Sequence, residues 1–578
     1  MRLSRNDYMN IPRPEHPNPQ FERNNWMNLN GTWSFEIDNQ NSGEAKEFYK
    51  PEAVFSKEIT VPFCPESELS GVCIKDFILG VWYKKSVELL PLDYLGKRVI
   101  LHFGACDFFT KVYVNENCVG SHKGGYTPFS FDITQFLSDK LTTITVYARD
   151  DTRNSMQSIG KQSFTYNSQE CIYTRTTGIW QTVWIEFIPE SFIQSVKYYP
   201  NADNCSLDIQ ATVCGKGRIE ATAYYNNKTV GVASAEASSG TVSLHLDLSE
   251  KYLWNVGEGK LYDLELRFCE DCVKSYFGLR SIRIDGKKFL INNKSVFQRL
   301  VLDQGFYKKG IYTAEKEEDF IKDIQISLDA GFNGARLHQK IFEPRFLYHC
   351  DKMGYMVWGE YPNCGLDHSY AQSLFTVLPE WLEAVNRDFN HPSIIGWCPF
   401  NETWDRNGRQ QIDDIIFNVY SLTKHLDPTR PCIDTSGNFH VKTDIFDLHD
   451  YEDDVERFKQ RYDNLMLNGV LEDKHSDRQQ YNGEPVFVSE YGGIQWSIDP
   501  DENSWGYGNA PKSEEEFVAR YKGLTDALLD NNQMLGFCYT QLYDVEQEQN
   551  GLYTYNREPK FDMNIFKEIN SRKAAIED

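Results

Sequence analysis

The chain has 578 residues and carries 60 Lys and Arg against 84 Asp and Glu, which gives a formal net charge of −24 at pH 7. This length predicts roughly two to four domains, and the negative charge argues against a nucleic-acid partner because it repels a phosphate backbone. No uninterrupted apolar run approaches the ~20 residues of a membrane-spanning helix, so no membrane partner is expected.

The N-terminal segment contains no apolar stretch after its first two arginines, so the pattern of a secretory signal is absent. The 14 cysteines are scattered singly and form no paired framework, as is typical of a protein with reduced cysteines. Both features predict a cytoplasmic location. Aromatic residues make up 14% of the chain, a share that suggests stacking surfaces for sugars as well as cores.

Residues 1–188 show short strands with alternating apolar residues, separated by turns, as in GTWSFEID, RVILHFGA and TTITVYARD. This pattern, without helix periodicity, predicts an all-β sandwich. A second β-rich stretch at residues 189–280 includes ATAYYNN, VSLHLDL and YDLELRF. Its size favours an immunoglobulin-like β-sandwich.

In residues 281–578 strands alternate with amphipathic helices, which is typical of parallel βαβ units. We expect eight strands, the number that closes a (β/α)8 TIM barrel in about 300 residues. They are expected at residues 296–303, 333–338, 355–361, 394–402, 431–436, 444–451, 485–491 and 535–541.

Active sites of such barrels lie at the C-terminal ends of the strands. Polar residues gather at these expected ends: Asp303, Arg336, His338, Glu360, Asn401, Glu402, His449, Asp450, Glu490, Tyr491 and Gln541. Two carboxylates, Glu402 after the fourth strand and Glu490 after the seventh, are expected to face each other across the barrel mouth. Glycoside hydrolysis needs such a pair, because one group protonates the leaving oxygen while the other stabilises positive charge at the anomeric carbon.

Other interpretations of this pair remain open. The carboxylates could bind a metal, although the chain has no H-E-x-x-H or comparable motif to supply further ligands. They could also be solvated charges at strand ends. A non-catalytic carbohydrate-binding protein would fit the aromatic content, but one of the two acids would then be expected to be replaced.

Two motifs, GWCPFNETW at residues 396–404 and PVFVSEYGG at residues 485–493, resemble glycoside hydrolase family 2, which includes β-galactosidases, β-glucuronidases and β-mannosidases. The order of sandwich, immunoglobulin-like module and barrel is also similar to that family. In the first domain, HFGACDFFTKVYVNENCVGSHKGGYTPFSFDIT and TTGIWQTVWIE resemble the family's sugar-binding jelly-roll sandwich. The resemblance covers nearly the whole chain.

The resemblance implies that Glu402 is the general acid/base and that Glu490 is the nucleophile of a double displacement that retains the anomeric configuration. The carboxyl groups are expected about 5 Å apart, and the pKa of Glu402 is expected to be raised in the free enzyme. Asn401 is expected to bind the 2-hydroxyl of the sugar. Tyr491 is expected to donate its phenol to the nucleophile or to the ring oxygen.

Arg336 is expected to compensate the two negative charges and keep Glu490 ionised, with a purely structural ion pair as the alternative. The remaining substrate-binding candidates are expected to contact sugar hydroxyls or, for the tryptophan, to stack on a sugar ring: Asp303, His338, His449, Asp450 and Trp496. A structural role is an equal alternative for His338, and a supporting role behind the site is one for His449 and Asp450.

The chain departs from its relatives at positions that set specificity. The S-H-Y-P sequence of several β-galactosidases is replaced by LHQKIFEP, and the magnesium-binding pattern of some relatives is missing, so no cofactor or metal is expected. β-Glucuronidases of the family hold the substrate carboxylate with an Asn-x-Lys motif, where this chain has Glu548 and Asn550. Without that cation a uronic acid loses its strongest partner.

The favoured function is therefore an exo-acting β-glycosidase for a terminal neutral sugar, with a β-galactosidase as the best guess. Lys340 and Arg345, near the second strand, could supply charge from another direction, which keeps a β-glucuronidase or another family 2 β-glycosidase open as the alternative. The expected partner is an oligosaccharide or glycoside substrate. A homo-oligomer is also expected from family habit.

Overall fold

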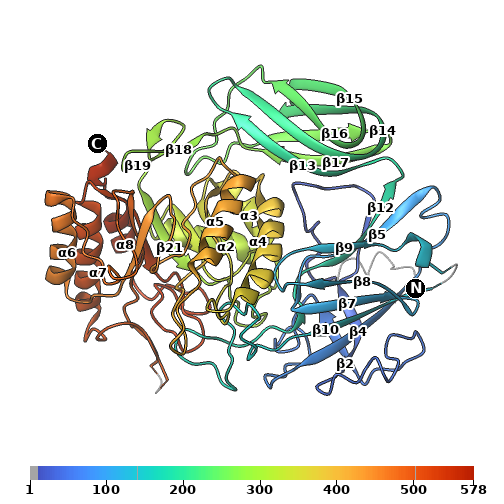
Figure 1. The fold of residues 1–578 in the computed structure, drawn as a ribbon, viewed down its shortest axis with the longest axis horizontal. Helices are drawn as coiled ribbons and strands as arrows, with labels where there is room; N and C mark the ends of the chain where they lie inside the picture. The colour runs from blue at the N-terminus through green and yellow to red at the C-terminus, as the bar shows by residue number, and fades with distance from the viewer. Residues whose placement is uncertain (1–10, 139–140, 501–502, 578) are drawn as a thin grey trace.

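The computed structural model describes residues 11–138, 141–500 and 503–577. These residues form a β-sandwich, an immunoglobulin-like module and a barrel in chain order (Figure 1). The first ten residues, on which the expectation about a secretory signal partly depends, lie outside the described ranges. Among the described residues no helix is long and apolar enough to cross a membrane. We retain 1–188, 189–280 and 281–578 as proposed domain boundaries.

The N-terminal sandwich, drawn in blue, consists of two main antiparallel sheets. Side chains alternate between a buried and a more exposed face, as in Lys97–Phe103, so the inner faces of both sheets share one apolar core. The six-stranded sheet has the order β3 (Lys57–Val61), β2 (Gly31–Ile37), β4 (Gly80–Val87), β10 (Thr142–Arg149), β7 (Phe109–Val114), β8 (Asn117–Lys123), and the four-stranded sheet has the order β1 (Trp26–Asn28), β12 (Val183–Pro189), β5 (Lys97–Phe103), β9 (Phe129–Asp132). The short strands β6 (Cys106–Asp107) and β11 (Gly178–Ile179) form a further pair.

The immunoglobulin-like module lies above the other two domains in Figure 1. Its central strand, β14, is 20 residues long and pairs with β13 along its first half and with β16 along its second half. This arrangement lets one strand serve both layers of a small apolar core. The strands are β13 (Phe192–Asn201), β14 (Ser206–Tyr225), β15 (Lys228–Asp247), β16 (Tyr262–Phe268) and β17 (Asp271–Phe277).

The C-terminal domain has a curled sheet of seven parallel strands with the helices outside it. The strand order is β24 (Ile394–Cys398), β23 (Met356–Glu360), β22 (Gly334–Leu337), β21 (Gln298–Asp303), β27 (Met534–Thr540), β26 (Val486–Gly492), β25 (Phe446–Asp450). The helices are α2 (Glu317–Asp329), α3 (Pro344–Met353), α4 (Leu374–Asp388), α5 (Asp413–Leu426), α6 (Val455–Asn468), α7 (Glu514–Leu529) and α8 (Met563–Asn570). The small sheet β18 (Ile282–Asp285), β19 (Lys288–Ile291), β20 (Lys294–Ser295) precedes the barrel.

The fifth expected strand, residues 431–436, is the place where the barrel differs from the prediction. It forms only isolated parallel bridges to the fourth strand, at Cys432 and Ser436, with Ser436 N donating to Phe400 O at 2.8 Å. On its other side Asp444 N donates to Cys432 O at 3.0 Å, but Cys432 N donates to the side chain of Asp444 at 2.9 Å and not to a backbone carbonyl. The segment lies in the position of the fifth strand, but it does not form the continuous backbone hydrogen bonds of a regular strand with either neighbour.

Candidate active site

Seven of the polar residues expected at the barrel mouth gather there: Arg336 and His338 at the end of β22, Glu360 at the end of β23, Asn401 and Glu402 after β24, His449 in β25 and Glu490 in β26. Parallel barrel strands all end at the same edge, where each delivers its inward-facing side chains. Each of these residues makes a polar contact with another member of the group.

A β-bulge turns Glu490 toward the barrel interior. Strict alternation along β26 would place Ser489 inside and Glu490 outside, because Phe487 packs in the barrel core. The register with β25 shifts just before His449, which pairs with Glu490. An extra residue in a strand redirects the side chains that follow it. Glu490 therefore points into the mouth, and Tyr491 points outward.

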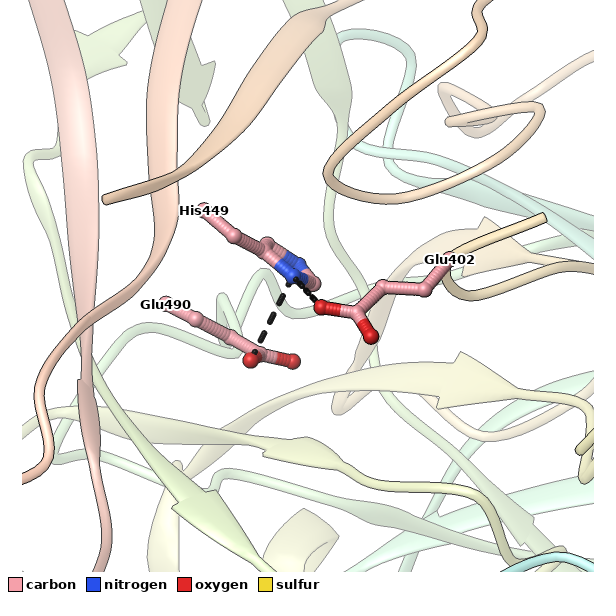
Figure 2. Close-up of side chains that lie close together, drawn as sticks. All are labelled: Glu402, His449 and Glu490. Carbon is pink, nitrogen blue, oxygen red and sulfur yellow. Dashed lines mark hydrogen bonds and ion pairs between the residues drawn. The ribbon is translucent and has the colours of Figure 1, made fainter. Parts of the chain in front are cut away.

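His449 lies between two carboxylates (Figure 2). Its Nδ1 is 2.6 Å from Oε1 of Glu402 and 3.4 Å from Oε2 of Glu490. One oxygen of each carboxylate lies within 4.8 Å of the other. Retaining glycosidases hold their two carboxyl groups about 5–5.5 Å apart, whereas inverting enzymes need about 6.5–9.5 Å to fit a water molecule. The separation here agrees with the retaining geometry.

Both oxygens of Glu490 receive a hydrogen bond. Arg336 Nη1 donates to Oε1 at 2.9 Å, and the phenol of Tyr451 donates to Oε2 at 2.5 Å. Arg336 is almost fully buried and also donates through Nε to Glu360 Oε2 at 2.7 Å. A separate donor on each oxygen restricts the orientation of the Glu490 carboxylate as well as its position.

The electrostatic surroundings keep Glu490 ionised. Burial alone would raise its pKa, but interactions with His449, Arg336 and His338 outweigh burial and lower the pKa. His338 Nδ1 lies 3.0 Å from Glu360 Oε1 and 3.9 Å from Glu490 Oε1. The sequence prediction for Arg336, that it compensates negative charge beside Glu490, agrees with this arrangement.

The state of Glu402 differs from the expectation. Burial would raise its pKa, but the hydrogen bond and charge of His449, together with Lys161 and His338, lower the pKa to about 2. The same contacts raise the pKa of His449, with Glu490 as its largest favourable cause, although burial opposes this. The expected raised pKa of Glu402 is therefore wrong for the substrate-free protein. These opposite shifts favour a proton on His449 Nδ1, 2.6 Å from the carboxylate.

Asn401 is held in a fixed orientation. Arg336 Nη2 donates to its Oδ1, its backbone N donates to Asn363 Oδ1 at 2.8 Å, and its carbonyl accepts from Asn363 Nδ2 at 3.0 Å. These contacts leave Nδ2 of Asn401 without a hydrogen-bond partner in the described part of the chain. The amide can therefore donate to a ligand, as a contact with a sugar hydroxyl requires.

Tyr491 and Asp450 lie outside the site because they alternate with inward-facing neighbours. The phenol of Tyr491 shares a hydrogen bond of 2.8 Å with Thr525 on α7 and does not contact the nucleophile. The carboxylate of Asp450 is paired with Arg461 on α6 and accepts from Tyr462 Oη at 3.0 Å. The predictions that these two residues contact substrate are corrected accordingly.

Asp303 and Trp496 also make their contacts outside the site. Asp303 is buried and accepts from Tyr543 Oη at 2.6 Å and from Gly305 N at 2.9 Å. Trp496 packs against Phe517 and Phe561, with ring centroids 6.2 and 6.0 Å away. The structure gives neither side chain a contact with the carboxylate pair.

The carboxylate pair and His449 form the one candidate metal group among the described residues. A metal would have to displace the proton that His449 Nδ1 shares with Glu402, and it would lie beside the guanidinium of Arg336, which already contacts Glu490. Since both positions are filled by positive charge, these residues fit a proton-bearing site better than a metal site.

A pocket of about 500 Å³ opens beside Glu402. Barrel residues such as Asn363 and Asn401 line one wall, and residues of the N-terminal sandwich, including Lys161, line the other. Sequence reasoning missed this second wall, because nothing local in the chain connects it to the barrel. It also missed Tyr451, which the alternation of β25 places on the same face as His449.

All three domains match models of a known protein family. The model of the TIM barrel domain of glycosyl hydrolases family 2 matches residues 282–573, the family's sugar binding domain matches residues 26–183, and a further family 2 model matches residues 191–280. The chain belongs to glycosyl hydrolases family 2. The family and the three-part fold expected from the sequence are thereby confirmed.

Among its relatives, this family 2 protein is 26% identical to a putative beta-glucuronidase of Formosa agariphila over 61% of the chain and 44% of the relative. It is 26% identical to a beta-galactosidase of Thermoanaerobacter pseudethanolicus over 65% of the chain and 51% of the relative. The chain thus spans about half the length of these two proteins. It is 23% identical to a beta-glucuronidase of Streptococcus agalactiae over 96% of both. The fold matches a Bifidobacterium dentium beta-glucuronidase with a TM-score of 0.80 at 19% identity, over 95% of this chain and 97% of that one.

Neither of the cations expected near the second strand of the family 2 barrel faces the pocket. Lys340 Nζ donates to the carbonyls of Gly305 and Tyr312 at 2.6 and 2.8 Å and lies among aromatic rings. Arg345 is paired with Glu317 on α2. The suggestion that these two residues supply charge to a substrate is therefore wrong.

Proposed function

We propose that this family 2 protein is a retaining exo-β-glycosidase in which Glu490 is the nucleophile and Glu402 is the general acid/base. The observation that carries the proposal is the pair of carboxylate oxygens within 4.8 Å of each other at the barrel mouth. Their different surroundings support different roles. Glu490 is buried and held by two donors, whereas the side chain of Glu402 is 39% exposed toward the pocket.

In the first step, Glu490 attacks the anomeric carbon and forms a glycosyl ester, while Glu402 delivers a proton to the departing glycosidic oxygen. That proton is held between His449 and Glu402 in the free protein. Asn401 donates to the 2-hydroxyl, a contact that strengthens as positive charge develops on the sugar ring.

In the second step, Glu402 takes a proton from water, and the resulting hydroxide attacks the anomeric carbon and releases Glu490. Once Glu490 has been esterified it carries no charge, so the largest favourable cause of the raised His449 pKa is lost. The fall in that pKa favours release of the proton in the first step and leaves the His449 and Glu402 pair deprotonated, so that it can accept a proton from water in the second step.

For the terminal sugar we propose a uronic acid, as in a β-glucuronidase. Support comes from the relatives, which include beta-glucuronidases that match 61% and 96% of this chain. A neutral β-galactoside is the second candidate, because Glu548 and Asn550 occupy the positions where the family's Asn-x-Lys motif would be. The Thermoanaerobacter pseudethanolicus beta-galactosidase also supports that candidate.

The test is a panel of p-nitrophenyl glycosides: the β-glucuronide, β-galactoside, β-glucoside and β-mannoside. We expect the highest kcat/KM on the β-glucuronide, with loss of activity in Glu490→Gln and unchanged activity in Glu456→Gln, a matched change on α6. A dominant β-galactoside rate would overturn the uronic acid while leaving the two carboxylate roles in place. Full activity of Glu490→Gln would contradict the mechanism.

A further inference from the structure

One loop of the N-terminal sandwich crosses to the barrel and forms part of the active-site pocket. It lies between β10 and β11, and its teal ribbon runs beside the barrel in Figure 1. Before Lys161, Ile159 N donates to Cys364 O at 2.9 Å, on the barrel loop that follows β23. After it, Gln547 Nε2 donates to Ile172 O at 3.0 Å.

Contacts on both sides therefore fix the position of Lys161. Its own carbonyl accepts from Tyr173 N at 2.7 Å, and the phenol of Tyr173 donates to the carboxylate of Glu548. Thr174 N lies 3.2 Å from the carboxylate of Glu546. These contacts hold the backbone of Lys161 against the barrel, although Lys161 belongs to another domain.

The ammonium of Lys161 is a cation with no direct partner. It lines the pocket together with Glu402 and Asn401. In the described ranges no carboxylate lies within ion-pair distance of it and no acceptor within hydrogen-bond distance. Its charge nevertheless acts on both acids: it contributes to the lowered pKa of Glu402 and opposes the rise that burial causes in the pKa of Glu548. A charged group held in a pocket without a partner is costly unless a ligand supplies one.

Glu548 does not supply that partner. Its two carboxylate oxygens accept from Tyr173 Oη and from Asn550 Nδ2, the latter at 3.0 Å. Gln541 Nε2 in turn donates to Asn550 Oδ1 at 2.9 Å. Glu548 is thus saturated by neutral donors, and burial raises its pKa to about 7. The barrel positions that would otherwise offer a cation are occupied by an acid and an amide.

We propose that Lys161 is a specificity-determining residue that binds the carboxylate of the terminal sugar. The N-terminal sandwich then supplies the cation that the barrel lacks at Glu548 and Asn550. The ligand class is a β-linked uronic acid, and the inference rests on the glycosidase function proposed above. An ammonium offers three donors that rotate freely, so it can meet a carboxylate without the fixed geometry that a guanidinium requires.

The test compares Lys161→Met and Lys161→Arg with Lys57→Met. Lys57 belongs to the same domain, but it is exposed at the start of β3 and is not among the residues that line the pocket. A hydrogen bond to a charged group is worth about 1.5–3 kcal/mol, or about 10- to 150-fold in an equilibrium constant. We expect Lys161→Met to lower kcat/KM for p-nitrophenyl β-D-glucuronide by that factor and to change kcat/KM for the β-D-galactoside less than threefold.

Lys161→Arg should retain more glucuronide activity than Lys161→Met, and Lys57→Met should match the wild type on both substrates. An unchanged glucuronide rate in Lys161→Met, or an equal loss on both substrates with thermal unfolding unaltered, would overturn the proposal. The equal loss would instead indicate that Lys161 only neutralises the acids around it.

Binding of free D-glucuronate, measured by titration calorimetry, tests Lys161 without any turnover. We expect Lys161→Met to weaken binding by about 10- to 150-fold, while Lys57→Met binds as the wild type does. Equal glucuronate affinity in wild type and Lys161→Met would refute the role of Lys161 even in an inactive protein. Inactivity of the wild type on every glycoside would refute the glycosidase function separately.

Discussion

The phenol of Tyr451 offers a direct perturbation of the nucleophile. It donates to Glu490 Oε2 at 2.5 Å, while Arg336 holds the other oxygen. Tyr451→Phe removes this donor and keeps the ring, which stacks on Tyr507 with centroids 3.5 Å apart and planes at 3°. The variant should therefore fold normally, and its effect should be confined to Glu490.

A hydrogen bond to a charged acceptor contributes about 1.5–3 kcal/mol, which corresponds to about 10- to 150-fold in rate if it is lost from the transition state. The loss of this hydrogen bond lowers the rate in two ways. With one donor left, Glu490 can rotate away from its in-line position, and a misplacement of about 1 Å costs about 100-fold. The lost bond also favoured the ionised carboxylate, so the pKa of Glu490 rises and the acid limb of the rate profile moves to higher pH.

The assay is kcat/KM between pH 4 and pH 9 on the best p-nitrophenyl glycoside, for wild type, Tyr451→Phe and Tyr507→Phe. The second variant removes a hydroxyl from the neighbouring ring, and its phenol makes no hydrogen bond to Glu490 within the described chain. We expect kcat/KM to fall by about 10- to 150-fold and the acid limb to move to higher pH in Tyr451→Phe alone. A rate within twofold of wild type and an unshifted limb would refute the role given to this phenol.

Three further predictions concern the same site. Glu360→Gln breaks a buried ion pair with Arg336 and should lower the free energy of unfolding, measured with urea, by about 3–5 kcal/mol. The pKa of Glu360 is lowered to about 2. Its contribution to stability is therefore complete above the ordinary pKa of about 4.3 and is lost as the pH falls toward 2. A variant whose free energy of unfolding depends on acid pH as that of the wild type does would contradict this. His449→Gln removes the group whose raised pKa holds the proton, so the alkaline limb of kcat/KM should move to lower pH, and an unmoved limb would assign the proton elsewhere. Treatment with EDTA should leave hydrolysis unchanged, whereas a loss that divalent cations restore would show that a metal shares the site with Glu402, His449 and Glu490.

The sequence was sufficient for the fold because each domain carries its own periodicity. The switch from alternating strands to βαβ units after residue 280 predicts a barrel, and the motifs around Glu402 and Glu490 identify the family. Residues 431–436 were expected to form a regular strand, but the carboxylate of Asp444 replaces a neighbouring strand as the partner of Cys432 N. This replacement of a strand partner by a side chain cannot be recognised from the pattern of apolar residues.

The site could be predicted only as far as strand ends determine it. Position along the chain places both Glu490 and Tyr491 at the mouth, but only the bulge in β26 decides which of them points inward. For Asp450, the alternation of side chains along β25 is enough to predict an outward direction, since its neighbour His449 points toward Glu402 and Glu490. Lys161 could not be found this way, because it reaches the pocket from a different domain.

The most direct test of the central claim is the anomer released first. Hydrolysis of the best β-glycoside substrate can be followed by proton NMR within the first minutes, before mutarotation mixes the anomers. With one carboxylate oxygen of Glu402 within 4.8 Å of one of Glu490, no room is left between Glu490 and the anomeric carbon for the attacking water that an inverting mechanism requires. We predict that the β-anomer appears first and the α-anomer only later by mutarotation. Initial release of the α-anomer would contradict the assignment of Glu490 as a covalent nucleophile.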